Sequence, residues 1–425
     1  MRILVVGGGA REDALSWRLA ASPSCEALVH APGNAGTAAR GENWSDLAVT
    51  DARAIAARAR DARIDLVILG PETAIAAGVG DACRDAGLSV FGPNRSGGRL
   101  ESSKIFAKRF MERHTIPTAP FKIVHTVEQA KRVLESWRGG AVVKADGLAA
   151  GKGVVVCDDA AEALATVKSW YDGGGVPGGG TDVLIERRLR GREVSVFAVA
   201  DGRAMVPVAA ACDYKRAGDD DTGPNTGGMG AYSPPAGFGD DLLDRVRERI
   251  VAPVLRGLLA EAEDYRGVLY CGLMETDAGL QVIEFNARFG DPETQVLMPR
   301  VGGDFARYCK SAADGMLEID AATWSADACV GVVIATSKYP YENTPLRGLP
   351  VDLGLRDGTV AFWGPSKREG DTIALPGGRV LTVTACAANL DDARSRVYAA
   401  IADMKKRFPP GAPLAYRSDI ARLSP

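Results

Sequence analysis

Two segments of the sequence combine charged residues with glycine and show no apolar periodicity, which is typical of a site rather than of a core. The first comprises residues 213–216 and 221–230. The second comprises residues 283–293, where Glu284 and Asn286 stand two residues apart on an expected strand. Because alternate residues of a strand face the same way, these two oxygen ligands are expected to converge. Such a pair suits Mg²⁺ that bridges nucleotide phosphates.

A glycine-rich loop at residues 144–153 follows one expected strand and precedes another at residues 154–156. The spacing of its glycines differs from that of a Walker A loop. A glycine loop between antiparallel strands can instead close over a triphosphate, with its amides forming an anion nest and with Lys104 and Lys144 supplying positive charge. The alternative is a hairpin with a structural role only.

Two smaller groups of charged residues suit substrate binding. Arg288 could form a forked contact with a substrate carboxylate while Asp213 holds an amino group, so that together they recognise a free amino acid. Structural ion pairing is the alternative. Glu186 and Glu193 flank a turn after an expected edge strand, where backbone groups could hold adenine and a carboxylate could bind ribose hydroxyls. Charges around a short loop more often form a solvated face.

Residues 7–12 follow the first expected strand and invite comparison with the phosphate-binding turn of dinucleotide folds. The comparison fails because Glu12 occupies the third glycine position and no acidic residue follows the second strand to hold a ribose. NAD(P) is therefore not favoured. Arg11 and the backbone amides of the turn still favour an anion, and a plain βα turn is the alternative.

The elements that position these residues belong to several domains, because 425 residues correspond to roughly two to four domains of ordinary size. Apolar runs alternate with helical stretches near the N-terminus, which predicts a parallel α/β sheet. A helix is expected at residues 242–263 and a mobile glycine-rich connection at residues 172–180. Further strands are expected at residues 183–186, 193–200, 270–275, 330–335 and 379–385.

Composition argues against several classes of partner. The net charge is −3, the pI is near 5.8 and no basic tract is present, so nucleic acid is not expected. The eight cysteines form no Cys-x-x-Cys pair and only three His are present, which argues against zinc sites and disulfides. No apolar run reaches about 18 residues. We therefore expect a cytoplasmic protein that acts on small molecules, with no membrane contact and no signal peptide.

The order of these elements resembles the ATP-grasp superfamily and, more closely, the phosphoribosylamine-glycine ligase family. The resemblance covers nearly the whole chain and is most specific at residues 31–36, 144–153, 221–234 and 284–293. It implies an α/β and α+β multidomain architecture with an ATP-grasp fold. The implied parts are an N-terminal parallel-sheet domain at 1–101, an ATP-grasp domain at 102–327 with a lid at about 118–190, and a C-terminal α+β domain at 328–425.

The resemblance also implies a reaction. ATP would phosphorylate the carboxylate of glycine, and the amine of 5-phosphoribosylamine would attack the glycyl phosphate, giving glycinamide ribonucleotide, ADP and phosphate in de novo purine biosynthesis. Mg²⁺, or Mn²⁺ in its place, would neutralise charge on the transferred phosphoryl group. The implied assembly is a monomer, with a dimer as the alternative. Rival hypotheses are an amide-forming paralogue with a different amine acceptor, an ATP-responsive scaffold and an NAD(P) oxidoreductase.

By the same resemblance, individual residues acquire roles. The catalytic group would be Arg288, Lys215, Asp213 and Asn225. ATP would be bound by Lys104, Lys144, Gly151, Lys152, Gly153, Glu186, Leu189 and Glu193. The acceptor would be bound by Gly9, Arg11, Glu12, Asn34, Glu72, Gly228 and Asp291, and the metal by Glu284 and Asn286.

Departures from the family pattern concentrate on the acceptor side. Asp13 and Tyr214 stand where the family usually has His, Ala74 interrupts a Gly-Pro-Glu-x-Pro-Leu run, and residues 362–365 replace a His-Ala-Gly-Thr run. An aspartate at about 4 Å from a phosphate would cost about 1 kcal/mol in a water-like dielectric. In the first turn of a helix, Asp13 would instead interact favourably with the helix dipole. A changed acceptor amine is the sharper hypothesis.

Overall fold

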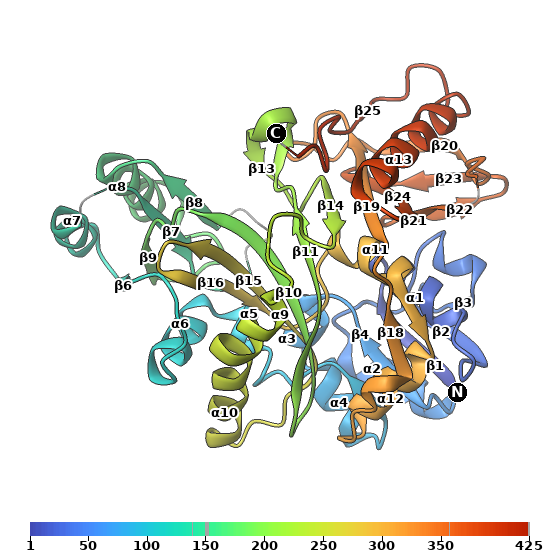
Figure 1. The fold of residues 1–425 in the computed structure, drawn as a ribbon, viewed down its shortest axis with the longest axis horizontal. Helices are drawn as coiled ribbons and strands as arrows, with labels where there is room; N and C mark the ends of the chain where they lie inside the picture. The colour runs from blue at the N-terminus through green and yellow to red at the C-terminus, as the bar shows by residue number, and fades with distance from the viewer. Residues whose placement is uncertain (138, 149–152, 357, 424–425) are drawn as a thin grey trace.

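A parallel sheet forms the N-terminal part of the structure (Figure 1), a computed structural model that describes residues 1–137, 139–148, 153–356 and 358–423. Its strands are β1 (Arg2–Gly7), β2 (Ala27–Pro32), β3 (Glu42–Asn43), β4 (Leu66–Leu69) and β5 (Ser89–Phe91), in the order β3-β2-β1-β4-β5. Every pairing is parallel. β1 and β4 are nearly continuous buried apolar runs, as expected for a sheet covered on both faces. The predicted parallel α/β sheet is confirmed.

The glycine turn after β1 leads directly into a helix. The helices of this part are α1 (Ala10–Ala20), α2 (Ala52–Asp61), α3 (Glu72–Ala76), α4 (Val79–Asp85) and α5 (Arg99–Ser102). At the start of α1, the carboxylate of Glu12 accepts the N–H of Gly9 at 2.7 Å, as in a capping box. Because the turn follows the last residue of β1, it lies at the carboxyl edge of the sheet, where parallel α/β sheets bind their ligands.

The lid is a four-stranded antiparallel sheet that projects from the rest of the molecule (Figure 1). Its strands are β6 (Phe121–Val124), β7 (Ala141–Ala145), β8 (Val154–Cys157) and β9 (Val183–Arg187), with helices α7 (Val127–Ser136) and α8 (Ala160–Lys168). β7 and β8 form the hairpin predicted around the glycine loop. β9 pairs with both β6 and β7, so the expectation that Glu186 lies on an edge strand was wrong.

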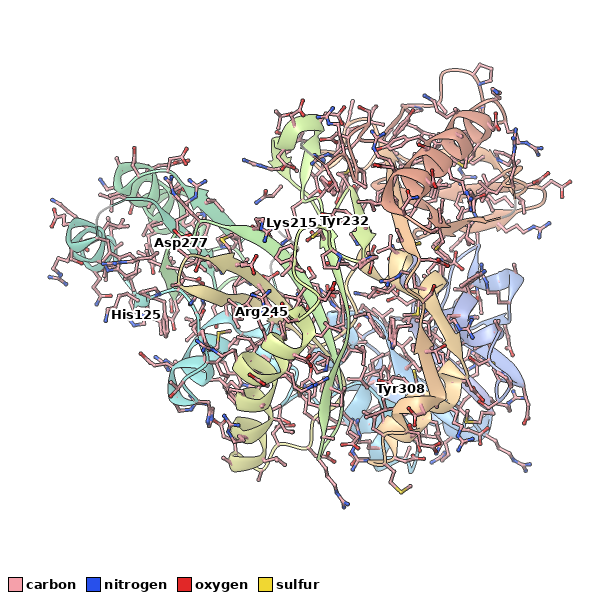
Figure 2. All side chains as sticks on the ribbon, viewed as in Figure 1. His125, Lys215, Tyr232, Arg245, Asp277 and Tyr308 are labelled. Atoms are coloured by element: carbon pink, nitrogen blue, oxygen red, sulfur yellow. The ribbon has the colours of Figure 1, made fainter. Side chains whose placement is uncertain are left out.

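A single antiparallel sheet runs through the ATP-grasp part and the C-terminal part, in the order β16-β15-β10-β11-β14-β19-β24-β21, with β25 paired to β19. The bounds of its strands are β10 (Arg192–Asp201), β11 (Met205–Asp213), β14 (Gly230–Ser233), β15 (Arg266–Thr276), β16 (Gly279–Asn286), β19 (Ala328–Thr336), β21 (Thr359–Trp363), β24 (Arg379–Ala387) and β25 (Leu414–Ala415). β14 joins the two halves because it pairs with β11 on one side and with β19 on the other. Figure 2 places Lys215 and Tyr232 at this junction.

The remaining elements connect and cover these sheets. Where one helix was predicted at 242–263, the structure has α9 (Leu242–Val246), a π-helical turn (Arg247–Val251) and α10 (Ala252–Ala260). Pro253 explains the irregular turn because it has no N–H for a helical hydrogen bond to the preceding turn. The other helices and strands are α6 (Lys104–Arg113), α11 (Glu293–Leu297), α12 (Phe305–Ala313), α13 (Leu390–Lys405), β12 (Arg216–Gly218), β13 (Thr222–Asn225), β17 (Val301–Gly303), β18 (Ala322–Trp324), β20 (Leu346–Pro350), β22 (Lys367–Glu369) and β23 (Thr372–Leu375). Within the described ranges, no helix has the length and apolar character needed to cross a lipid bilayer.

Apolar packing separates the lid from the rest of the molecule. The lid has its own cluster, built around residues such as Leu134 and Val143. By contrast, one cluster joins Val6 of β1 to Val282 of β16, and another also spans the N-terminal and large sheets. The N-terminal sheet and the large sheet are therefore packed as one body, whereas the lid is held together by a separate core.

Candidate active site

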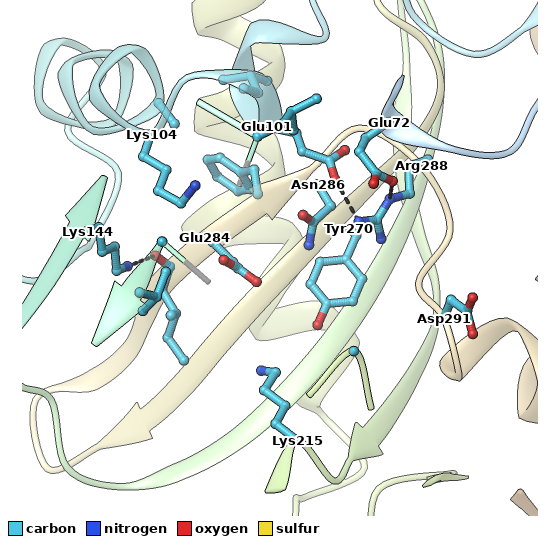
Figure 3. Close-up of a pocket in the computed structure, with 18 of the residues that line it drawn as sticks. Glu72, Glu101, Lys104, Lys144, Lys215, Tyr270, Glu284, Asn286, Arg288 and Asp291 are labelled. Carbon is cyan, nitrogen blue, oxygen red and sulfur yellow. Dashed lines mark hydrogen bonds and ion pairs between the residues drawn. The ribbon is translucent and has the colours of Figure 1, made fainter. Parts of the chain in front are cut away.

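A cavity of about 370 Å³ lies where the lid, α6, the N-terminal part and the large sheet meet (Figure 3). Charged side chains from segments far apart in the sequence line it. The predicted residues among them are Glu72, Lys104, Lys144, Gly153, Glu186, Asp213, Lys215, Glu284, Asn286, Arg288 and Asp291. Glu193 lines a small adjoining pocket together with Asp213 and Lys215. The two charged segments of the sequence therefore meet at one place.

The other predicted residues lie beyond the wall of this cavity or outside the described chain. Gly9, Arg11, Glu12, Asn34, Leu189, Asn225 and Gly228 are described by the structure but do not line the cavity. Gly151 and Lys152 of the glycine loop lie outside the described residues.

A β-bulge directs the predicted metal ligands into the cavity. Val282 faces the core, and in a regular strand Glu284 and Asn286 would share its face. The register between β15 and β16 shifts by one residue at Ile283. The extra residue reverses the alternation beyond it, so that Phe285, which also borders the cavity, packs into the core. Glu284 and Asn286 then place their polar groups in the cavity (Figure 3).

Three lysines face the metal pair from different elements. Lys104 comes from α6, Lys144 from β7 and Lys215 from the segment after β11. Burial raises the pKa of Glu284, but the opposing effect of these lysines is larger, so the pKa lies below its usual value. Glu284 is therefore ionised and, with the amide oxygen of Asn286, offers oxygen donors that suit Mg²⁺. The residues present fit a metal that bridges phosphates.

Glu186 is held between two lysines. Its Oε2 lies 2.8 Å from Nζ of Lys108 and its Oε1 lies 2.8 Å from Nζ of Lys144, and all three side chains are 3–5% exposed. Lys144 also donates to the carbonyl of Ile283 at the bulge, at 3.3 Å. Burial lowers the pKa of Lys108 to about 8, against the opposing effect of Glu186. In this geometry Glu186 is paired with two ammonium groups.

The start of the glycine loop is tied to α6. Lys104 donates through Nζ to the carbonyl of Gly147 at 2.9 Å. Asp146 accepts the hydroxyl of Ser103 at 3.0 Å and the N–H of Ile105 at 3.1 Å. Ser103 is the N-cap of α6, so the loop begins at a fixed point beside the cavity.

Asp213 and Lys215 form one end of the cavity. Nζ of Lys215 lies 3.7 Å from Oδ1 of Asp213 and 3.1 Å from Oε2 of Glu193. Burial lowers the pKa of Lys215, yet Asp213 and Glu193 raise it more, and the result is well above its usual value. Burial raises the pKa of Asp213, against the opposing effect of Lys215. An anion and a cation side by side can bind the two ends of an amino acid.

Arg288 is engaged by two carboxylates (Figure 3). Its Nη2 lies 2.6 Å from Oε1 of Glu101, and its Nε lies 3.3 Å from Oε2 of Glu72. Nη1 of Arg11 lies 3.9 Å from the same Glu72 oxygen. The structural ion pairing that was the alternative for Arg288 is therefore present. The guanidinium still lines the cavity, where it can contact a substrate as well.

Four of the predicted acceptor residues lie at or beside the glycine turn after β1, namely Gly9, Arg11, Glu12 and Asn34. Asn34 donates through Nδ2 to the carbonyls of Gly9 and Trp363, at 3.1 and 2.7 Å. Nε of Arg11 lies 2.6 Å from Oε1 of Glu12. Because Trp363 ends β21, the turn is fixed partly by the C-terminal part of the chain.

Asp291 also contacts the C-terminal part. Arg379 of β24 donates to Oδ1 and Oδ2 of Asp291 at 3.1 and 3.0 Å, and to the carbonyl of Gly227 at 2.8 Å. The neighbouring Gly228 has φ of +107°, and a Cβ there would clash with the ring of Pro292. Arg379 thus holds two loops of the cavity region together.

Two of the departures from the family pattern contact each other. Asp13 is fully buried in the first turn of α1, forms an ion pair with Arg40 and accepts the N–H of Trp363 at 2.8 Å. Arg40 also donates to the carbonyl of Gly36 at 2.8 Å. Burial raises the pKa of Asp13 to about 6, against the opposing effect of Arg40. The carboxylate is already engaged inside the fold, where an arginine offsets the negative charge that raised the question of phosphate repulsion.

Sequence reasoning assigned no role to several residues of the site. They are Glu101, Lys108, Tyr270, Glu293 and Arg379. Two of them had a usable signal: Lys108 stands four residues after Lys104 on one helix face, and Glu293 belongs to the charged segment 283–293. The partners of the other three are distant in the sequence, so no local pattern indicates these contacts.

Nearly the whole chain matches the models of one known protein family. Residues 1–101 match the family described as phosphoribosylglycinamide synthetase, N domain. Residues 102–294 match its ATP-grasp (A) domain, and residues 329–423 match its C domain. The phosphoribosylamine-glycine ligase of Phenylobacterium zucineum is 45% identical over 408 residues, covering 94% of this chain and 95% of that protein. The ligase of Escherichia coli (strain K12) is 42% identical over 410 residues, covering 95% of each.

Solved structures agree with these relatives. The crystal structure of phosphoribosylamine-glycine ligase from Thermotoga maritima has a TM-score of 0.84 and 30% identity, covering 99% of this chain and 100% of that one. The biotin carboxylase domain of Hydrogenobacter thermophilus 2-oxoglutarate carboxylase has a TM-score of 0.67 and 14% identity, covering 94% and 89%, and shows the fold alone. The chain therefore belongs to the phosphoribosylamine-glycine ligase family of ATP-grasp enzymes, ADP-forming ligases of de novo purine biosynthesis.

Proposed function

We propose that the cavity joins glycine to 5-phosphoribosylamine in two steps. ATP phosphorylates the glycine carboxylate, and the amine then attacks the glycyl phosphate to give glycinamide ribonucleotide, ADP and phosphate. The observation that carries the proposal is the bulge at Ile283, which turns Glu284 and Asn286 toward the lysines of the cavity. An oxygen pair beside a cluster of cations suits a metal-bridged triphosphate.

The nucleotide is proposed to bind under the lid. Glu284 and Asn286 would hold Mg²⁺, with Mn²⁺ as a substitute, and the metal would neutralise charge on the transferred phosphoryl group. Lys104 and Lys144 would donate hydrogen bonds to phosphate oxygens. Lys144 is already fixed by Glu186 and the bulge carbonyl, so its ammonium is in place before the substrate arrives, as electrostatic preorganisation requires.

Glycine is proposed to bind between Arg288 and the pair formed by Asp213 and Lys215. The guanidinium and the ammonium suit the carboxylate that is to be phosphorylated, and Asp213 suits the ammonium of the amino acid. These groups converge on one cavity from the end of β11 and from the loop after β16. Positioning of this kind supplies much of the catalysis in phosphoryl transfer, so no protein nucleophile is required.

The acceptor amine is proposed to enter at the carboxyl edge of the N-terminal sheet. Gly9 and Arg11 follow β1, and Glu72 follows β4, at the edge where open α/β sheets bind ligands. Asp291 lines the cavity, Asn34 lies behind its wall at the glycine turn, and both are held by the C-terminal part. The strong match to the family favours its own acceptor over a different amine.

We further propose that one chain in the reducing cytoplasm is the functional unit. A single chain supplies every residue of the site described above. All eight cysteines are free thiols, which suits a reducing compartment.

The test is phosphate release from Mg·ATP by the purified protein with glycine, with and without freshly prepared 5-phosphoribosylamine, while the product is identified by mass. We expect glycinamide ribonucleotide only when both substrates are present. Turnover of ATP with glycine that never yields this product, but yields an amide with another amine, would refute the acceptor assignment.

A variant tests the metal site. Glu284→Gln is expected to lower turnover by about 100-fold or more, because the metal that would neutralise charge on the transferred phosphoryl group loses its anionic ligand. It should also weaken Mn²⁺ binding in the presence of a non-hydrolysable ATP analogue, measured by electron paramagnetic resonance. Asp277→Asn, on the exposed turn of the same hairpin, is the matched control and should change neither quantity. Unchanged Mn²⁺ affinity in Glu284→Gln would contradict the assignment.

A further inference from the structure

Glu293 is a buried carboxylate between the proposed glycine and acceptor ends of the cavity. It is the first residue of α11, stands two residues after Asp291 and is 4% exposed. Its side chain lines the cavity together with Asp213 and Arg288. A Cβ at Gly290 would clash with its carboxylate, so the side chain packs closely on the backbone of the turn that leads into α11.

The partners of Glu293 differ from those of most carboxylates in the cavity. Five of the others have a cation within 4.0 Å, in the pairs Glu72 with Arg288, Glu101 with Arg288, Glu186 with Lys144, Asp213 with Lys215 and Asp291 with Arg379. In the described part of the chain, only Glu284 and Glu293 line the cavity without such an ion pair. Oε1 of Glu293 accepts the hydroxyl of Ser195 at 3.5 Å, and Oγ of Ser195 lies 2.7 Å from the hydroxyl oxygen of Tyr270. The carboxylate therefore keeps acceptor capacity for a ligand.

The second step of the reaction needs a proton acceptor. When the amine attacks the glycyl phosphate, a C–N bond forms and the C–O bond to phosphorus breaks, with the electron pair leaving on phosphate. The attacking nitrogen must then lose one proton to become a neutral amide. A positioned general base with a pKa near the working pH accelerates such a step by about 100-fold to 10,000-fold.

We propose that Glu293 is the catalytic residue that accepts the proton from the attacking amine, an assignment that rests on the proposed function. The proton taken up by Glu293 is returned to the departing phosphate, so the carboxylate is regenerated in each cycle. Glu284 is committed to the metal in that function, and the remaining cavity carboxylates are committed to lysine or arginine partners.

The charge environment of Glu293 supports this role. Burial, followed by the nearby Asp213, raises the pKa of Glu293 to about 7. The ionisable groups that face it are Asp213 and Lys215 beside β11, Tyr270 on β15, Arg288 after β16 and Arg379 on β24. A group with this pKa takes up and releases a proton readily near neutral pH. Product formation is expected to rise with pH through about 7 as Glu293 ionises.

The experiment measures the two steps separately in Glu293→Gln. The first step is followed by positional isotope exchange between the β,γ-bridging and terminal oxygens of ATP, with glycine present and the acceptor absent. The second is followed by glycinamide ribonucleotide formation from about pH 6 to about pH 9. Glu248→Gln, on an exposed helical turn, is the matched control. We expect isotope exchange within about threefold of wild type, product formation lowered about 100-fold and the rise with pH abolished.

Other outcomes separate the possible failures. Equal loss of isotope exchange and product formation in Glu293→Gln would overturn the assignment, because Glu293 would then serve phosphoryl transfer or folding. Unchanged product formation would overturn it as well. Absence of glycine-dependent exchange in the wild-type protein would instead refute the proposed function itself. If the glutamine variant does not fold, Glu293→Asp supplies the same comparison, and its product formation must fall more than its isotope exchange for the inference to stand.

Discussion

Asp13 is a residue whose charge the fold accommodates at a cost. Burial raises its pKa from 3.8 to about 6, against the opposing effect of Arg40. Because the folded state binds this proton more tightly than the unfolded state, the contribution of Asp13 to stability falls as the pH rises between these two values. A shift of about 2 pKa units corresponds to about 3 kcal/mol.

We expect Asp13→Asn to become more stable relative to wild type by up to about 3 kcal/mol as the pH rises from about 4 to about 7, because the variant has no charge to bury. The measurement is the free energy of unfolding of both proteins by urea at several pH values. Asp85→Asn, at the exposed end of α4, is the control and should show no such trend. A pH-independent difference between Asp13→Asn and wild type would mean that Asp13 stays ionised throughout this range.

Residue types predicted much of the site, but not the partners that fix it. Glu284 and Asn286 could be found because their spacing of two residues is visible locally. The ion pairs between Lys108 and Glu186, and between Asp291 and Arg379, join segments that are distant in the sequence. Local patterns carry no information on such pairings, so Lys108 and Arg379 were missed.

At the scale of single elements, β16 is a strand in which the alternation expected from the sequence differs from the alternation in the structure. Simple alternation along the strand would have placed Glu284 with the apolar residues, and the bulge at Ile283 corrects this by one residue. The strands of the lid were predicted from their apolar runs, whereas the inner position of β9 depends on its pairing with both β6 and β7. Strand order of this kind is a tertiary property.

The separate core of the lid leads to a prediction about local stability. Leu134 of α7 is 3% exposed and packs only within the lid cluster. We expect Leu134→Ala to lower the free energy of local unfolding of the lid by about 2 to 5 kcal/mol, because the substitution leaves a cavity in the lid core. Hydrogen exchange should therefore rise in β6 to β9 while β1 and β15 keep their protection.

Val282→Ala is the contrasting variant, because Val282 belongs to the cluster shared by the N-terminal sheet and the large sheet. Its effect on hydrogen exchange should extend through both sheets. A uniform rise of exchange across the whole chain in Leu134→Ala would show that the lid does not open as a separate unit.

At the scale of the whole molecule, the C-terminal part is built into the site. β14 makes the ATP-grasp sheet and the C-terminal sheet continuous. Trp363 contacts both Asn34 and Asp13 of the N-terminal part, and Arg379 contacts Asp291. Two of the departures from the family pattern, Asp13 and Trp363, meet at one of these contacts.

Arg379 allows this coupling to be measured. We expect Arg379→Ala to raise the KM for the acceptor amine about tenfold, because a bidentate charge-assisted contact with Asp291 is lost at the proposed acceptor end. The KM values for ATP and glycine should change by less than about twofold, since the metal pair and the lysines are fixed by other contacts. Steady-state kinetics with each substrate varied in turn gives all three values. Arg347→Ala removes an exposed ion pair with Glu369 elsewhere in the C-terminal part and should leave them unchanged. An equal rise of all three KM values in Arg379→Ala would mean that Arg379 supports the fold in general and does not position the acceptor end.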